Sequence, residues 1–224
     1  MTVSQLPAPQ RSHARSNRAR ILATAREELS RNADASLDEL ARAAGVARRT
    51  LYGHFPNRQV LVAALAEEAT ASVEQAFTAA RRPDDDPVSS LARVTLAVWA
   101  VGDRYRMLIS LARRDLGEEG IRAALAPARA EVTSILERGQ VDGVIADHVP
   151  APVLSQALEA LTLALIEAQN APGWSDPAGE AAALSLLLAA GVPCAAARDR
   201  VHAILAEAGR GPESLFAPQM PTGR

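Results

Sequence analysis

The residues with the clearest chemical character lie in one short segment, Ala47 to His54, whose spacing predicts a helix. On a helical wheel, Leu51 and Phe55 point to one side, which would be buried. The opposite side and its flanks present two guanidinium groups, a hydroxyl and a phenol, from Arg48, Arg49, Thr50 and Tyr52. A guanidinium can donate two hydrogen bonds to guanine in the major groove, and all four groups can bond to phosphate. This face therefore predicts contact with duplex DNA.

A helix of about eight residues cannot fold alone, so neighbouring helices must hold it in place. The preceding helix has a clear start, because Ser36 and Glu39 have the spacing of a capping box. Gly45 ends that helix, and its tolerance of positive φ permits the sharp turn of a helix-turn-helix. Apolar residues at helical spacing predict supporting helices on both sides, one from Asn17 and one from Asn57 to about Ala80. The inward-facing residues expected on the second are Val60, Leu61, Ala64 and Leu65.

Charge is distributed unevenly along the chain. Up to Arg58 there are ten Arg and five acidic residues, so this part carries about +5, while the whole chain carries −2. A basic head on an acidic body suggests that the head meets a polyanion. All 24 basic residues are Arg, so a compositional bias on a solvated face explains the same excess.

The remaining sequence predicts an all-α protein of about nine to ten helices, since no strand-like alternation persists. We expect a flexible arm over residues 1–15, a DNA-binding domain over 16–80 with its helix-turn-helix at about 36–55, a helical domain over 81–208, and a flexible tail over 209–224. No signal peptide or membrane span is evident, so the expected location is the cytoplasm. Beyond the Pro- and Asp-rich segment from Arg81 to Pro87, breaks at glycines and prolines predict helices at about 88–102, 104–116, 119–140, 151–170, 177–190 and 194–208.

The segment from Leu40 to Leu65, LARAAGVARRTLYGHFPNRQVLVAAL, resembles the DNA-binding signature of the tetracycline-repressor (TetR) family of bacterial transcription regulators. The matching features are the AAGV turn, the TLY–HF core and a basic residue two positions after Pro56. The resemblance extends over about Asn17 to Glu68. It implies an N-terminal three-helix domain that binds DNA, followed by a larger helical body that binds a small effector and forms a dimer.

The resemblance also implies a role for each polar residue of the motif. Thr50, Tyr52 and His54 would bond to phosphates, as would Ser36 and Arg58 near helix N-termini. Arg48 and Arg49 would read bases, and the arm from Arg11 to Arg20 would reach phosphate or the minor groove. Two positions depart from the usual pattern of the family: Ala47 stands where Ser or Thr often caps the recognition helix, and Gly53 replaces a bulky residue.

The body gives weaker indications. Two segments, 151–170 and 177–190, are apolar around much of their circumference and are the expected homodimer interface, with 194–208 as the competing segment. The expected effector is small and largely apolar, although ordinary core filling is the favoured explanation for each single candidate residue. The candidates for the pocket walls are Trp99, Tyr105, Met107, Leu111, His148 and Trp174.

Two other classes of function remain open at this point. A helical enzyme is disfavoured because the chain has no Gly-rich phosphate loop, no GxSxG and no HExxH, so we expect no catalytic residue, no metal and no cofactor. A protein-interaction module with a degenerate helix-turn-helix is disfavoured because Thr50, Tyr52 and Arg58 are all present. The favoured function is a sequence-specific transcriptional regulator that binds a palindromic operator as an effector-released repressor, although the sequence does not separate repressor from activator.

Overall fold

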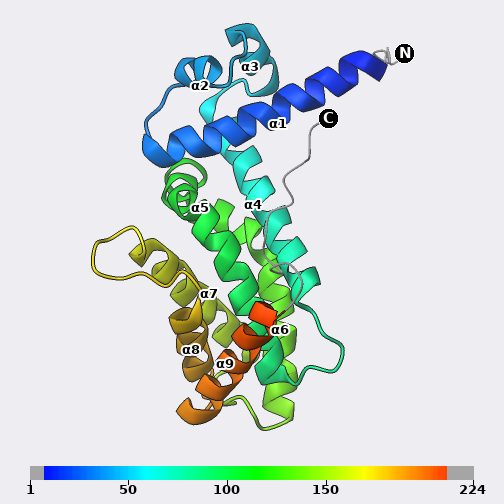
Figure 1. The fold of residues 1–224 in the computed structure, drawn as a ribbon, viewed down its shortest axis with the longest axis vertical. Helices are drawn as coiled ribbons and strands as arrows, with labels where there is room; N and C mark the ends of the chain where they lie inside the picture. The colour runs from blue at the N-terminus through cyan, green and yellow to red at the C-terminus, as the bar shows by residue number, and fades with distance from the viewer. Residues whose placement is uncertain (1–7, 211–224) are drawn as a thin grey trace. The chain divides into compact units, whose positions relative to one another are not determined.

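The computed structural model describes the backbone of residues 8–210 and the side chains of residues 16–209 (Figure 1). Every regular element in this range is an α-helix, which confirms the predicted all-α class. Of the tail predicted over 209–224, residues 209 and 210 belong to the last helix, and residues 211–224 lie outside the described residues, as do the first seven residues of the predicted arm. The helices are α1 (Ala8–Arg31), α2 (Leu37–Ala43), α3 (Arg48–His54), α4 (Arg58–Ala80), α5 (Pro87–Ala124), α6 (Ala126–Val141), α7 (Ala151–Ala168), α8 (Glu180–Ala189) and α9 (Cys194–Arg210).

The chain forms two compact units, and each of the long helices α4 and α5 contributes to both. The first unit contains the residues up to Ala69 together with Met107–Ala124, and the second contains Thr70–Arg106 and the residues from Leu125 onwards. The first unit therefore includes the C-terminal part of α5 in addition to the three N-terminal helices. The Pro- and Asp-rich segment after Arg81 is the connection between α4 and α5.

In the first unit, α1, α2 and α3 pack against one another around a small apolar core (Figure 1). Each buried aliphatic side chain contributes about 1.5–3 kcal/mol to folding, so this set is what holds the short α3 in place. Val60 was expected in this core, but it is 40% exposed, because the buried stripe of α4 begins one residue later. The core side chains are Ile21, Leu22, Ala25, Leu29, Leu40, Leu51, Phe55, Leu61, Val62 and Leu65.

Three helix boundaries differ from the sequence-based expectation. α1 begins at Ala8 rather than Asn17, since Pro9 falls in its first turn, where proline is tolerated. α5 continues through Gly102, where a break was expected. A Cβ on Gly102 would collide with Ile166 of α7, so this glycine allows close packing of the two helices and does not end α5. The helix expected over 119–140 is divided at Leu125, since Pro127 can only occupy the first turn of a new helix. The break expected at Gly117 is present, with φ 73° and ψ 174°.

In the second unit, α6, α7, α8 and α9 pack in sequence, and the N-terminal part of α5 completes the core. Trp99 of α5 is fully buried, and its indole Nε1 donates a hydrogen bond to the Asp176 carbonyl oxygen at 2.7 Å. α7 is long and apolar enough, by length and composition alone, to cross a membrane, yet only 28% of it is buried within the chain. Much of this apolar helix is therefore left uncovered by its own unit.

Candidate nucleic-acid interface

The two faces of α3 differ as the helical wheel predicts. Leu51 and Phe55 are buried in the core of the first unit, whereas Arg49 and Tyr52 are exposed. The N-terminus of α3 is preceded by Ala47, which makes no side-chain hydrogen bond to the helix. The first backbone N–H groups of α3 therefore have no side-chain cap from Ala47. The exposed outer face of the helix can meet another molecule.

Two of the outer residues share one carboxylate on α2. The Arg48 Nε lies 2.8 Å from the Asp38 Oδ1, and the Tyr52 hydroxyl donates to the same oxygen at 3.4 Å. The Arg48 guanidinium carbon also lies 5.9 Å from the centre of the Tyr52 ring. Sequence reasoning missed Asp38, because its spacing from Arg48 becomes meaningful only once the turn between α2 and α3 is formed.

The other predicted contact residues of α3 are less constrained. Arg49 is exposed, while Thr50 and His54, one turn apart on the helix, are half-buried. The His54 ring centre lies 6.2 Å from that of Phe55, and the Arg18 guanidinium of α1 lies 5.5 Å from the Phe55 ring centre. Gly53 is exposed on the outer side, and a Cβ there would meet no atom within 4 Å.

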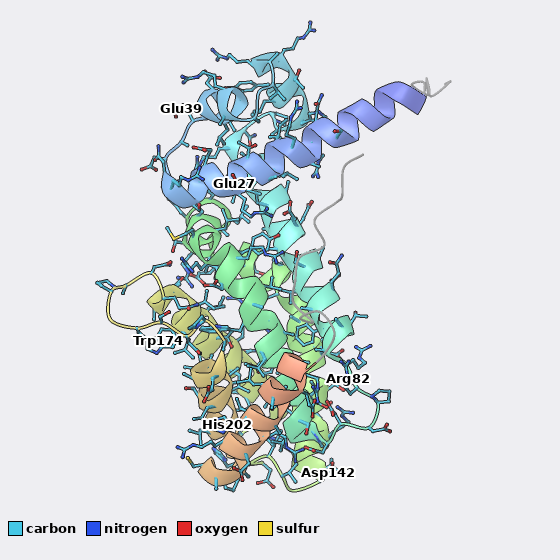
Figure 2. The ribbon with its side chains drawn as sticks, viewed as in Figure 1. Glu27, Glu39, Arg82, Asp142, Trp174 and His202 are labelled. Atoms are coloured by element: carbon cyan, nitrogen blue, oxygen red, sulfur yellow. The ribbon has the colours of Figure 1, made fainter. Side chains whose placement is uncertain are left out.

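Ser36 acts in the structure as the N-cap of α2. Its hydroxyl accepts from the Glu39 backbone N–H at 3.3 Å, and its own backbone N–H donates to the Glu39 Oε2 at 2.7 Å, which confirms the predicted capping box. Hydrogen bonds from the Ser36 backbone and hydroxyl hold the pKa of the Glu39 carboxyl below its usual value. Glu39 is exposed in the first turn of α2 (Figure 2).

Arg58, the first residue of α4, donates hydrogen bonds to other residues of the first unit. Its guanidinium donates to the backbone carbonyls of Ala33 and Ala35 at 2.5 and 2.8 Å, and to the Asp115 Oδ2 of α5 at 3.2 Å. These bonds use three of the five N–H donors of the guanidinium. Arg114 reaches the same loop, with its Nη1 2.9 Å from the Asp34 Oδ1. Arg58 thus ties the α1–α2 loop to the C-terminal part of α5, a contact that no local pattern signalled.

The candidate effector residues fall into both units. In the second unit, Trp99 and Trp174 make an edge-to-face contact with ring centres 6.0 Å apart, and the Tyr105 hydroxyl lies 3.4 Å from the Ser72 hydroxyl. Trp174 lies in the loop between α7 and α8 (Figure 2). The others are Met107 and Leu111, which belong to the first unit, and His148, which is exposed in the connection between α6 and α7. Among the described side chains, no group of three or more His, Cys, Asp or Glu residues could hold a metal ion.

Comparison with known proteins identifies the N-terminal part of the chain. Residues 21–65 match the family model described as bacterial regulatory proteins, tetR family. These residues run from α1 through α3 into the first part of α4. No curated protein matches the chain.

Solved structures of about 20% sequence identity share the fold over most of the chain. RolR in complex with resorcinol is 21% identical with a TM-score of 0.61, covering 91% of this chain and 98% of that one. LfrR from Mycobacterium smegmatis in complex with proflavine is 23% identical (TM-score 0.61; 77% and 96% covered). NalD, the secondary repressor of the MexAB-OprM multidrug efflux pump in Pseudomonas aeruginosa, is 22% identical (TM-score 0.62; 79% and 97% covered). Residues 21–65 therefore belong to the tetR family of bacterial regulatory proteins, and the solved structures show that the chain as a whole has the fold of RolR, LfrR and NalD.

Proposed function

We propose that this regulator is an effector-released repressor that binds a palindromic operator as a homodimer. The observation that carries the proposal is the outer face of α3, where Arg49 and Tyr52 are exposed on a helix whose other side is fixed in a core. A cationic, hydrogen-bonding face on a rigid helix is what major-groove recognition requires. The proposal gives no residue a catalytic role.

Within this face, base reading and phosphate binding fall to different side chains. Arg48 and Arg49 are the proposed base readers, since their guanidinium groups can bond to guanine O6 and N7. Phosphate contacts fix the register of the helix without selecting a sequence. The proposed phosphate contacts are Ser36, Thr50, Tyr52, His54 and the donors of Arg58 that its internal bonds leave available.

We assign the homodimer interface to α7 and α8, within residues 151–170 and 177–190. Val153 and Leu188 are exposed large hydrophobic residues on these helices, and the exposed face of α7 continues through Ala157, Ala160 and Ala164. Small side chains allow two helices to approach closely. An uncovered apolar face usually marks an interaction surface, and we assign this one to a second copy of the chain.

α9 is the less favourable choice for the interface. Its exposed face carries Arg198, Asp199, Arg200 and His202, and the His202 Nε2 already lies 2.9 Å from the Glu180 carboxylate of α8. Leu187 is fully buried in the core of the second unit, so its exposed neighbour Leu188 is the residue to change in a test of the interface.

The effector is proposed to be small and largely apolar. The structural relatives RolR and LfrR are described with resorcinol and proflavine, both aromatic molecules, and the pair of Trp99 and Trp174 provides aromatic surface in the second unit. In this proposal residues 16–80 bind DNA and residues 81–208 bind the effector. The protein acts in the cytoplasm. The effector releases DNA by favouring a separation of the two α3 helices that no longer matches successive major grooves, about 34 Å apart.

Selection of bound duplexes from a random-sequence pool tests the proposal as a whole. A homodimer should enrich sequences whose two halves are related by two-fold symmetry, with half-site centres about 10 base pairs, or a multiple of that, apart. Enrichment of sites without symmetry would contradict the dimeric arrangement, and no enrichment at all would contradict sequence-specific binding.

A further inference from the structure

The carboxylate of Asp38 stands in an unusual place for a protein that binds a polyanion. It lies on α2 within contact of the outer face of α3, where its Oδ1 is 2.8 Å from the Arg48 Nε in an ion pair and accepts a hydrogen bond from the Tyr52 hydroxyl at 3.4 Å. A negative charge beside a phosphate backbone weakens binding to every DNA sequence alike. Its presence therefore calls for a compensating role.

The geometry of the Arg48 contact indicates that role. The Asp38 carboxylate forms an ion pair on the Nε side of the guanidinium, and the two terminal nitrogens, Nη1 and Nη2, remain for another partner. These two nitrogens form the fork that pairs with guanine O6 and N7. The centre of the Tyr52 ring lies 5.9 Å from the Arg48 guanidinium carbon, so the ring also restricts the positions that the guanidinium can take.

We infer that Asp38 is a specificity-determining positioning residue, which orients Arg48 for base reading and restrains it from indiscriminate pairing with phosphate. The inference rests on the proposed function, since it assumes that the α3 face meets DNA. A long, flexible Arg side chain loses conformational entropy when it binds. A neighbour that holds the side chain in the base-reading orientation lowers this entropic cost for binding the correct base, but not for binding phosphate. Asp38 thus lowers total affinity while raising the difference between cognate and random sequences.

A structural role for Asp38 makes a different prediction. Asp38 lies in the first turn of α2, where an acidic side chain interacts favourably with the N-terminus of the helix. If that were its only role, replacement would lower stability and leave the ratio of cognate to random affinity unchanged. The two roles are therefore separated by measuring discrimination rather than affinity alone.

The test compares the full-length wild type with Asp38→Ala and Asp38→Asn by fluorescence anisotropy, on a duplex enriched by the wild type and on a random-sequence duplex, over a series of salt concentrations. We expect the cognate-to-random ratio to fall at least about fivefold, the lower end of the discrimination that one bidentate contact provides. Random-duplex affinity should rise, and its salt dependence should steepen by about one phosphate contact, because Arg48 is released. Asp38→Asn keeps the shape and the acceptor oxygen, so it covers the case in which Asp38→Ala unfolds.

Two controls make the result specific to Arg48. Glu27→Gln removes the same charge from an exposed position on α1 (Figure 2), and it should change both affinities alike. In an Arg48→Ala background, Asp38→Ala should reduce the ratio no further. An unchanged ratio in both Asp38 variants, or an equal loss with and without Arg48, would overturn the inference. Failure of the wild type to bind any duplex would instead refute the proposed function on which it rests.

Discussion

Replacement of Arg58 by Ala removes three hydrogen bonds at once from the first unit. The lost partners are two loop carbonyls, at Ala33 and Ala35, and the largely buried carboxylate of Asp115. A neutral hydrogen bond contributes about 0.5–1.5 kcal/mol and one between charged groups about 1.5–3 kcal/mol. The Arg58 side chain is 27% exposed, so water replaces part of the loss, and we expect the free energy of unfolding to fall by about 2–4 kcal/mol.

Urea unfolding followed by far-ultraviolet circular dichroism, at one fixed protein concentration, measures this change. Arg58→Lys should recover only part of the stability, because a single ammonium group cannot replace a planar fork that reaches three acceptors. Arg42→Ala is the matched control, since Arg42 is an exposed arginine on the neighbouring α2, and it should alter stability by less than about 0.5 kcal/mol.

The same variant separates the two roles of Arg58. If its internal bonds dominate, Arg58→Ala lowers the stability of the protein, and any loss of DNA affinity follows from that change. An Arg58→Ala protein as stable as the wild type, but with weaker binding to every duplex, would refute the reasoning and leave phosphate contact as the main role of this side chain.

Three further predictions concern the recognition helix, the second unit and the dimer. Arg49→Ala should lose about 1–3 kcal/mol at one base position only, whereas Tyr52→Phe should weaken binding to all duplexes alike, as anisotropy titrations of operator variants would show. Gly179→Ala should lower the free energy of unfolding by about 2–4 kcal/mol, because φ is +73° and the new Cβ would lie 2.7 Å from the Trp99 ring. Leu188→Glu should give a folded monomer in sedimentation experiments with little operator affinity, since Leu188 is exposed within one chain.

Matched positions elsewhere in the second unit provide the controls. Gly143 has φ +69° but no atom within 4 Å of an added Cβ, so Gly143→Ala should cost less than Gly179→Ala by about 1–3 kcal/mol, the overpacking contribution. Val144 and Leu188 are equally exposed, at 42%, and Val144→Glu should leave the dimer intact. Equal losses from the two glycine variants, or a dimeric Leu188→Glu protein that binds the operator fully, would contradict the corresponding assignment.

The helix-turn-helix could be predicted from the sequence because its determinants are local. Ser36 and Glu39 lie three residues apart, and Gly45 supplies the positive φ of the turn, 63°. Leu51 and Phe55 lie four positions apart, so they share the buried side of α3, and the polar residues between them face outward. Each of these features is readable within one helical turn, so the motif and its exposed face followed from the residues alone.

The features that sequence reasoning missed depend on contacts between distant residues. Arg58 and Asp115 are separated by 57 positions, and nothing near either one indicates the other. The break expected at Gly102 is absent because packing against Ile166 outweighs the modest helix-breaking tendency of one glycine, about 1 kcal/mol. The pairing of Trp99 with Trp174 likewise arises from the packing of the second unit.

The proposed function assigns sequence-specific affinity for DNA to the outer face of α3. Anisotropy titrations of the full-length protein, with the duplex enriched by selection and with a random duplex at several salt concentrations, test it most directly. We expect the enriched duplex to bind at least about 10³-fold more tightly, with both affinities falling steeply as salt rises. Equal affinity for the two duplexes, or no binding even at low salt, would show that the outer face of α3 does not recognise a DNA sequence.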